Sequence, residues 1–213
     1  MPHAFAEAER GRLTPAQFRA FQEARPDHER WELIEGEPVM MTPPSLAHNR
    51  IASNLERLLN DALETHDPSR EAVQRPGLEL TIDQAAFPEI ERGYRPEPDV
   101  AVIDHEPVPG RRFVSRAHLL AEIVSTADEA RPHAGVARWI DVKTRLYRAH
   151  PPCAVVLVLE QERIAARLWR RSDDGWDEAV LDGAATVLDL AGFGLRCGLG
   201  ALYQGTHLRP RRS

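Results

Sequence analysis

Apolar positions in the first third of the chain recur with the spacing of a helix, two strands and a second helix. The segment Thr14–Gln17 predicts a helix start, with Thr14 as N-cap, proline at the first helical position and glutamine completing a capping box. Trp31–Met41 predicts two short strands around Gly36. Ser45 then predicts the cap of a long helix whose apolar residues share one face: Ile51, Leu55, Leu58, Leu59, Ala62 and Leu63.

The rest of the chain alternates between strand and helix patterns. The almost unbroken apolar run in His118–Ser125 predicts a central strand that is covered on both faces. The other predicted elements are strands at Leu78–Ile82, Pro98–Ile103 and Cys153–Leu159, a helix at about Val136–Arg148, a hairpin of Arg163–Arg170 with Trp176–Leu181, and a short helix near Leu199–Gln204. The order predicts an α/β fold with a mixed central sheet flanked by helices.

The length of 213 residues, of which 42% are hydrophobic, suits one packed domain. We expect a flexible N-terminus over residues 1–12, a single domain over 13–205 and a basic disordered tail over 206–213. The first residues lack the apolar core of a signal peptide, and the longest apolar run, Cys153–Leu159, is too short to span a bilayer. We therefore expect a soluble cytoplasmic protein with no membrane contact.

Charge and residue usage narrow the possible chemistry. A net charge of −6 argues against a protein that coats nucleic acid by overall positive charge, so any such contact must come from a local basic patch. The two cysteines lie far apart, and His105, His118, His133 and His150 show no zinc-protease spacing. Of the 27 basic residues, 26 are arginine and one, Lys143, is lysine.

Two carboxylates lie in the predicted sheet. Glu122 interrupts the apolar run of the central strand, where a buried carboxylate requires either an arginine partner or a bound cation. Asp99 begins the preceding strand, and both a turn residue and a metal ligand fit that position. If the two strands are neighbours, the side chains of Asp99 and Glu122 can meet and provide the oxygen ligands that Mg²⁺ or Mn²⁺ prefers.

Lys143 lies in the apolar stripe of its predicted helix, on the face of Trp139, Ile140, Leu146 and Tyr147. The helical spacing therefore predicts that its ammonium points toward the sheet, although a lysine side chain can also extend past its neighbours to water. Two carboxylates that hold a metal ion, together with an inward ammonium, suit phosphodiester hydrolysis.

The sequence resembles the Uma-two family of restriction-endonuclease-like proteins in the PD-(D/E)XK nuclease superfamily, over roughly Leu13–Tyr203. The matching pieces are WELIEGEPVMMTPPSLAHNRI, RPEPDVAVID, AEIVS and the spacing of Lys143 and Tyr147. The resemblance implies a restriction-endonuclease-like fold in which Asp99 and Glu122 bind the metal and Lys143 is the active-site lysine. The sequence departs from the plain pattern of the superfamily. In that pattern a lysine stands two residues after the second acidic residue, but in this chain the residue two after Glu122 is Val124.

Two further residues match this family. Glu32 matches the glutamate that opens its E-L-I-x-G strand, and His48 matches a histidine early in its first long helix. Both are added to the predicted catalytic residues, and Glu35 stays open as the alternative to Glu32 for the glutamate that faces the site.

The resemblance implies a Mg²⁺-dependent endonuclease that hydrolyses phosphodiester bonds in DNA, with RNA less favoured, Mn²⁺ as a substitute ion and a homodimer as a compatible state. Two alternatives stay open. One is a catalytically idle nucleic-acid-binding or regulatory protein on the same fold. The other is a dimerisation module in which Glu122 pairs with Arg138 or Arg145 while Lys143 is turned to solvent.

Overall fold

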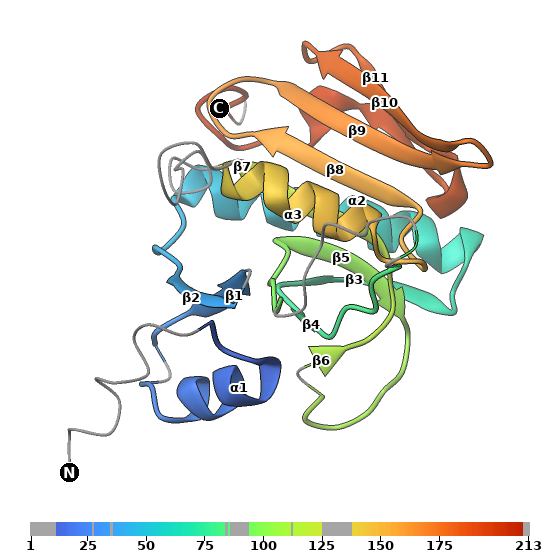
Figure 1. The fold of residues 1–213 in the computed structure, drawn as a ribbon. Coiled ribbons are helices and arrows are strands. Elements are labelled where there is room, and N and C mark those ends of the chain that lie inside the picture. Colours follow the sequence, from blue (N-terminus) through green and yellow to red (C-terminus); the bar gives the residue numbers. More distant parts are fainter. Residues whose placement is uncertain are drawn as a thin grey trace.

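The centre of the molecule is a six-stranded sheet in the order β10-β9-β8-β7-β5-β3 (Figure 1). A computed structural model describes residues 12–26, 28–34, 36–83, 85, 94–111, 113–124 and 138–210. β7 and β8 pair in parallel, and the other neighbouring strands pair antiparallel. The predicted mixed α/β sheet is confirmed. The strands are β3 (Arg70–Gln74), β5 (Val100–Asp104), β7 (Ala117–Val124), β8 (Val155–Glu160), β9 (Ala165–Ser172) and β10 (Gly175–Asp182).

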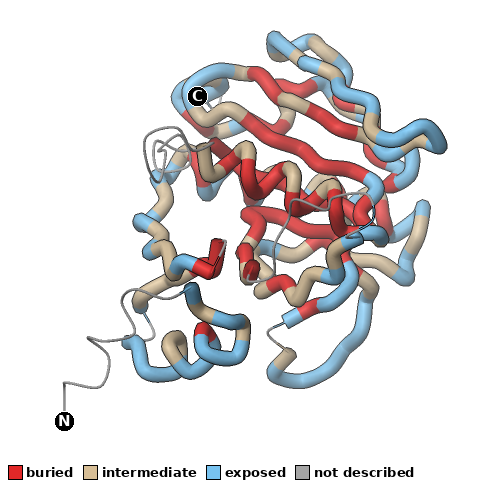
Figure 2. Tube along the Cα trace, viewed as in Figure 1, coloured by how far each residue is buried: buried red, intermediate tan, exposed pale blue. Residues whose placement is uncertain are grey.

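β7 is the most deeply buried strand, as its apolar run predicts. All eight of its residues are buried, and it lies between β5 and β8. Figure 2 shows the buried stretches gathered in the central strands and along the helix in front of them. A charged side chain in β7 is therefore inside the protein.

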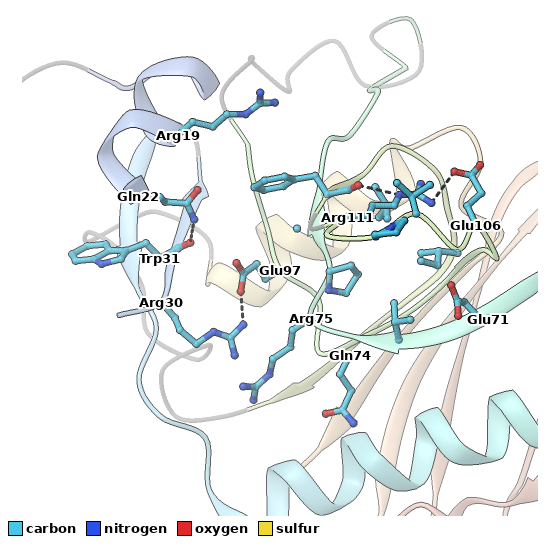
Figure 3. Close-up of a pocket in the computed structure, with 18 of the residues that line it drawn as sticks. Arg19, Gln22, Arg30, Trp31, Glu71, Gln74, Arg75, Glu97, Glu106 and Arg111 are labelled. Atoms are coloured by element: carbon cyan, nitrogen blue, oxygen red, sulfur yellow. Dashed lines mark hydrogen bonds and ion pairs between the residues drawn. The ribbon is translucent and has the colours of Figure 1, made fainter. Parts of the chain in front are cut away.

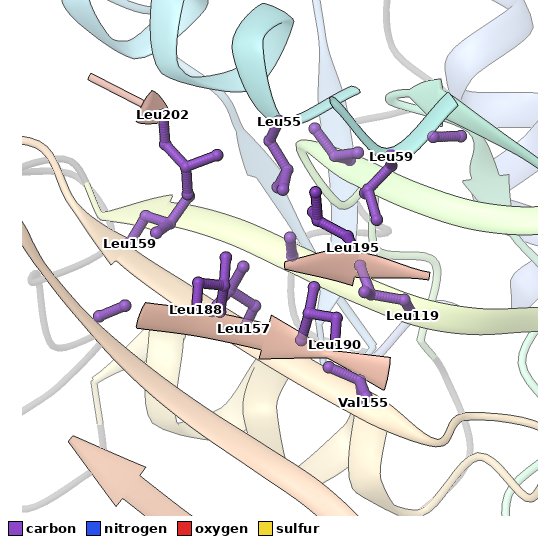
Figure 4. Packing of buried hydrophobic residues seen from close by; sticks show 14 of the residues in the cluster. Leu55, Leu59, Leu119, Val155, Leu157, Leu159, Leu188, Leu190, Leu195 and Leu202 are labelled. Atoms are coloured by element: carbon purple, nitrogen blue, oxygen red, sulfur yellow. The ribbon is translucent and has the colours of Figure 1, made fainter. Parts of the chain in front are cut away.

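Helices α2 (Leu46–His66) and α3 (Trp139–Arg148) cover opposite faces of the sheet (Figure 1). The α2 face also carries the hairpin of β11 (Val187–Leu190) and β12 (Leu195–Gly198), and their leucines pack together in Figure 4. On the α3 face, Ile140 and Tyr147 pack with the alternate residues of β7 and β8. This division follows from the two-residue side-chain period of strands.

A small N-terminal unit lies beside α3. It consists of α1 (Pro15–Glu23), β1 (Trp31–Ile34) and β2 (Glu37–Met40), and α1 begins with the predicted capping box of Thr14 and Gln17. Leu33 and Arg95 exchange two backbone hydrogen bonds of 3.2 and 2.7 Å, and Ile34 packs with residues of α3. These contacts hold β1 beside α3 and beside the residues that precede β5.

Two predictions for residues 67–83 need correction. β3 was not predicted, because its sequence is polar and only Ala72 in it is buried at this sheet edge. The strand predicted at Leu78–Ile82 is reduced to β4 (Gly77–Leu78), which pairs in parallel with β6 (Phe113–Val114). After β4, Glu79 N–H donates to the Val114 carbonyl of β6 and Asp83 N–H donates to the Ala149 carbonyl at the end of α3, each at 2.8 Å.

The C-terminal region also differs from expectation. The predicted helix at Leu199–Gln204 is a 3-10 helix of Leu199–Ala201, and the β11–β12 hairpin was not predicted. Residue 206 does not start a disordered tail: Thr206 is buried, and Gly205 N–H donates to the Arg209 carbonyl at 2.8 Å. Residues 211–213, like residues 1–11 and the expected helix start at Val136, lie outside the described residues.

No helix in the described part of the chain is long and apolar enough to cross a membrane.

Candidate active site

β5 and β7 bring Asp99 and Glu122 to one place. The antiparallel register pairs Val100 with Ala121, so the residue before β5 lies opposite the next residue of β7. Asp99 Oδ2 accepts a hydrogen bond of 2.8 Å from the Ile123 N–H, which fixes the carboxylate against β7. Asp99 and Glu122 are both buried and both line a cavity of about 190 Å³. The two strands are neighbours in the sheet, which is the condition for their carboxylates to meet.

Lys143 reaches this cavity from α3. Its side chain is only 2% exposed, and Nζ lies 3.0 Å from Glu32 Oε2 and 3.1 Å from Glu122 Oε2. The helical spacing predicted this inward direction. Because Lys143 is buried and paired with Glu122, the alternative in which it is turned to solvent is wrong.

Tyr147 lies one turn after Lys143 and donates its hydroxyl hydrogen bond to Glu122 Oε1. The two oxygens of the Glu122 carboxylate are thus held by two residues of the same helix. Burial, and then the nearby charge of Glu122, raise the pKa of Tyr147 well above its ordinary value, so the phenol stays protonated and keeps donating.

Glu32 comes to the site from β1. Its Oε1 accepts a 2.7 Å hydrogen bond from the Glu97 N–H, and its Oε2 contacts Lys143. Burial raises the pKa of Glu32, while the charge of Lys143 acts in the opposite direction. Glu32 therefore faces the site, whereas Glu35 lies outside the described residues.

His48, in the first turn of α2, contacts Asp99 and lines the same cavity. Its Nε2 is 3.1 Å from Asp99 Oδ2, and its backbone N–H donates to the capping Ser45 hydroxyl at 3.1 Å. Burial raises the pKa of Asp99, but the hydrogen bonds from His48 and Ile123 together bring it below its ordinary value. Among the described residues, His48 Nδ1 is a buried nitrogen with no hydrogen-bond partner.

The structure brings together all five residues singled out from the sequence. It adds Tyr147, Glu97, Arg30 and Arg75 to the same surroundings. Tyr147 had a sequence signal in its spacing from Lys143. Arg30 and Arg75 had none, because two arginines among 26 carry no pattern until the fold places them.

The donor set fits a hard divalent cation. Within the described ranges no group of three His, Cys, Asp or Glu side chains is placed to hold a metal ion, as a structural zinc site would require. Mg²⁺ differs, because it is commonly held by one or two carboxylates and keeps several water ligands. Asp99 and Glu122, which both line the cavity, meet that requirement.

Comparisons with known proteins give one family and one fold. The family model Uma2, described as "Putative restriction endonuclease", matches residues 15–199. A crystal structure from Anabaena variabilis ATCC 29413, described as a putative nuclease belonging to DUF820, has a TM-score of 0.64 and 14% identity, covering 90% of this chain and 97% of that chain. At that identity the likeness shows a shared fold. A search of curated proteins finds no match.

Proposed function

The chain belongs to the Uma2 family of restriction-endonuclease-like proteins, and on that basis we propose that it is a Mg²⁺-dependent endonuclease that hydrolyses phosphodiester bonds in DNA. The observation that supports this most is the position of Lys143, buried between Glu32 and Glu122 on the cavity that Asp99 also lines. A compact ammonium held inside a cavity acts on whatever charge develops there, not on the surface.

Asp99 and Glu122 would hold the metal ion, and divalent metals are in general use among restriction-endonuclease-like families. The ion, when bound, polarises a phosphate oxygen and lowers the pKa of a bound water. Mn²⁺ takes the same oxygen ligands and is expected to substitute.

The other residues position these groups. The Lys143 ammonium stabilises negative charge on the phosphate as the attacking oxygen adds. Glu32 and Glu122 both hold that ammonium, and Tyr147 donates its hydroxyl hydrogen bond to the other oxygen of the Glu122 carboxylate. His48 and the Ile123 N–H fix Asp99 in the same way. Such supporting contacts keep metal ligands in one orientation.

The proposal is tested by incubating the protein with supercoiled plasmid DNA in Mg²⁺, in Mn²⁺ and in EDTA. Nicked or linear DNA is expected with either ion and none with EDTA. A parallel incubation with RNA of similar length decides the substrate class, and DNA is expected to be cut faster. A matched control is Asp61→Asn, because Asp61 is an exposed aspartate on α2, and it should cut like the parent.

The catalytically idle alternative gives the opposite result. A folded protein that binds DNA and Mn²⁺ but leaves DNA and RNA uncut in both ions would favour the idle protein over the nuclease.

A further inference from the structure

Arg30 and Arg75 lie where the small cavity opens into a larger groove of about 1020 Å³. Both arginines line the cavity and the groove, and Glu97 is the third residue common to both. Figure 3 shows the two guanidinium groups reaching toward each other, Arg30 from the side of Trp31 and Arg75 from beside Gln74.

The backbone at Arg75 is held in an unfavourable conformation. Its φ is +53°, and in the described part of the chain it is the non-glycine residue with positive φ. A side chain with a β-carbon is strained in this left-handed region, and such strain is concentrated at functional sites. Glycine adopts the same conformation freely, so the backbone turn alone does not require arginine here.

The contacts that the Arg75 side chain makes within the protein do not require an arginine at this position either. One terminal nitrogen donates to Asn49 Oδ1 at 3.3 Å, and Nε is 3.9 Å from Asp99 Oδ1, which is beyond hydrogen-bond distance. The side chain is nevertheless mostly buried, with 23% exposed. Burial, and then the nearby charge of Arg30, lower the pKa of Arg75, while the charges of Asp99, Glu97 and Glu122 act more weakly in the opposite direction. A half-buried cation beside a second cation is stabilised by an anion placed between them.

The other arginines of the groove have closer partners within the protein than Arg75 has, and Arg30 is among them through its ion pair with Glu97. Arg19 pairs with Glu79, and Arg111 pairs with Glu106. The guanidinium of Arg25 lies over the rings of Phe21 and Trp31. A fork of donors facing an open cavity suits a phosphate, which guanidinium groups bind through two oxygens.

We propose that Arg30 and Arg75 form a phosphate-binding subsite that holds the backbone of the nucleic-acid strand at the entrance to the cavity. This inference rests on the proposed function, since it names the residues that guide a phosphodiester to Lys143. Arg75 contributes the free donors, and Arg30, held by Glu97, closes the subsite from the other side.

The test compares DNA binding by the parent and by Arg75→Gly in EDTA, where metal-dependent cleavage cannot occur. Fluorescence anisotropy of a labelled DNA duplex is followed over a range of salt concentrations. Arg75→Gly should bind about tenfold more weakly, which is the usual size for one charge-assisted contact. The slope of log Kd against log salt concentration should be smaller for this variant, by about the contribution of one phosphate contact.

Two further variants separate binding from folding. Arg57→Ala removes an exposed arginine on α2 that pairs with Asp61, and its affinity and salt slope should equal those of the parent. Arg75→Gly should melt at or above the parent temperature, because glycine relieves the positive φ. If Arg75→Gly fails to fold, Arg75→Asn replaces it, since asparagine also tolerates this conformation.

The outcomes distinguish this subsite from the nuclease proposal. Suppose that a folded Arg75→Gly binds DNA with the affinity and salt slope of the parent, and that the parent cleaves DNA in Mg²⁺. This result would overturn the subsite and leave the nuclease proposal standing. Binding that depends on Arg75, without any cleavage by the parent, would support the subsite and overturn the nuclease. Absence of DNA binding by the parent would overturn both.

Discussion

Lys143 is the single lysine of the chain, and its surroundings determine what can replace it. Its Nζ lies about equally far from the carboxylates of Glu32 and Glu122, and all three side chains are almost fully buried. The planar guanidinium of an arginine is wider and directs its donors differently. We predict that Lys143→Arg folds and binds Mn²⁺ but cleaves DNA at least about tenfold more slowly, because a misplaced cation forfeits roughly 2 to 4 kcal/mol of transition-state stabilisation.

The measurement is the initial rate of plasmid nicking in Mn²⁺, with circular dichroism to establish folding. The matched control is Arg145→Lys, the reverse exchange at a half-buried position of the same helix, which should cut at the parent rate. Cleavage by Lys143→Arg at the parent rate would show that the geometry of this cation does not limit the reaction.

Replacing Asp99 and replacing Glu122 are expected to have the same effect on activity but different effects on the stability of the fold. Asp99→Asn and Glu122→Gln should each abolish cleavage and weaken Mn²⁺ binding in calorimetry. Asp99→Asn keeps an oxygen that can accept from the Ile123 N–H, so its unfolding free energy should fall by only about 1 kcal/mol. Glu122→Gln deprives a buried ammonium of one carboxylate and should cost more, about 3 kcal/mol. Parent-level cleavage by either variant would contradict the assignment of that ligand.

At the scale of elements, burial decided which predictions held. β7, α2 and α3 present strong apolar patterns because they bury whole faces, and each is found near its predicted place, with α3 beginning at Trp139. β3 buries little at the sheet edge and therefore has almost no pattern of its own. The β11–β12 hairpin covers one side of the core with two strands of four residues, which are too short for a clear alternation.

The residues of the candidate site also fall into two groups, those that a sequence pattern identifies and those that it does not. Asp99, Glu122 and Lys143 were identified because each is a charged residue in an apolar or extended context. Arg75 comes to the site through a backbone turn after β3, and Glu97 through its backbone N–H, which donates to Glu32. Contacts made by turns and by main-chain atoms have no signature in the side-chain pattern.

The β5–β7 pair is expected to show a pH dependence at the end away from the site. Asp104 is the last residue of β5. Its Oδ1 lies 2.6 Å from His118 Nε2, and its Oδ2 lies 3.1 Å from Arg116 Nε. Burial raises the pKa of Asp104, but these partners lower it below its ordinary value of 3.8. A carboxylate with a lowered pKa stabilises the fold above its ordinary value, and this stability is lost as pH falls through the folded pKa.

We therefore predict that Asp104→Asn lowers the melting temperature by about 2–4 °C at pH 6, the effect of losing roughly one hydrogen bond. The difference between parent and variant should shrink as pH is lowered below 4. Thermal melts by circular dichroism at several pH values measure it. A difference that stays constant down to pH 2 would show that the Asp104 charge does not stabilise the fold.

For the whole molecule, the net charge of −6 opposes the approach of a polyanion. Binding of DNA must then depend on the few cations at the groove and cavity, and we predict that it is weak and steeply salt-dependent. Anisotropy measurements at low and at physiological salt test this. Equal affinity at the two salt concentrations would mean that phosphate contacts are not the basis of binding.

The central claim is that Asp99 and Glu122 hold a divalent metal ion beside Lys143. The most direct measurement is anomalous diffraction from crystals soaked in Mn²⁺. We predict one strong peak in the cavity, about 2.0–2.3 Å from a carboxylate oxygen of each residue, and its loss in crystals of Asp99→Asn. A cavity that stays without an anomalous peak, while Mn²⁺ binds elsewhere on the protein, would contradict the metal site and with it the proposed nuclease.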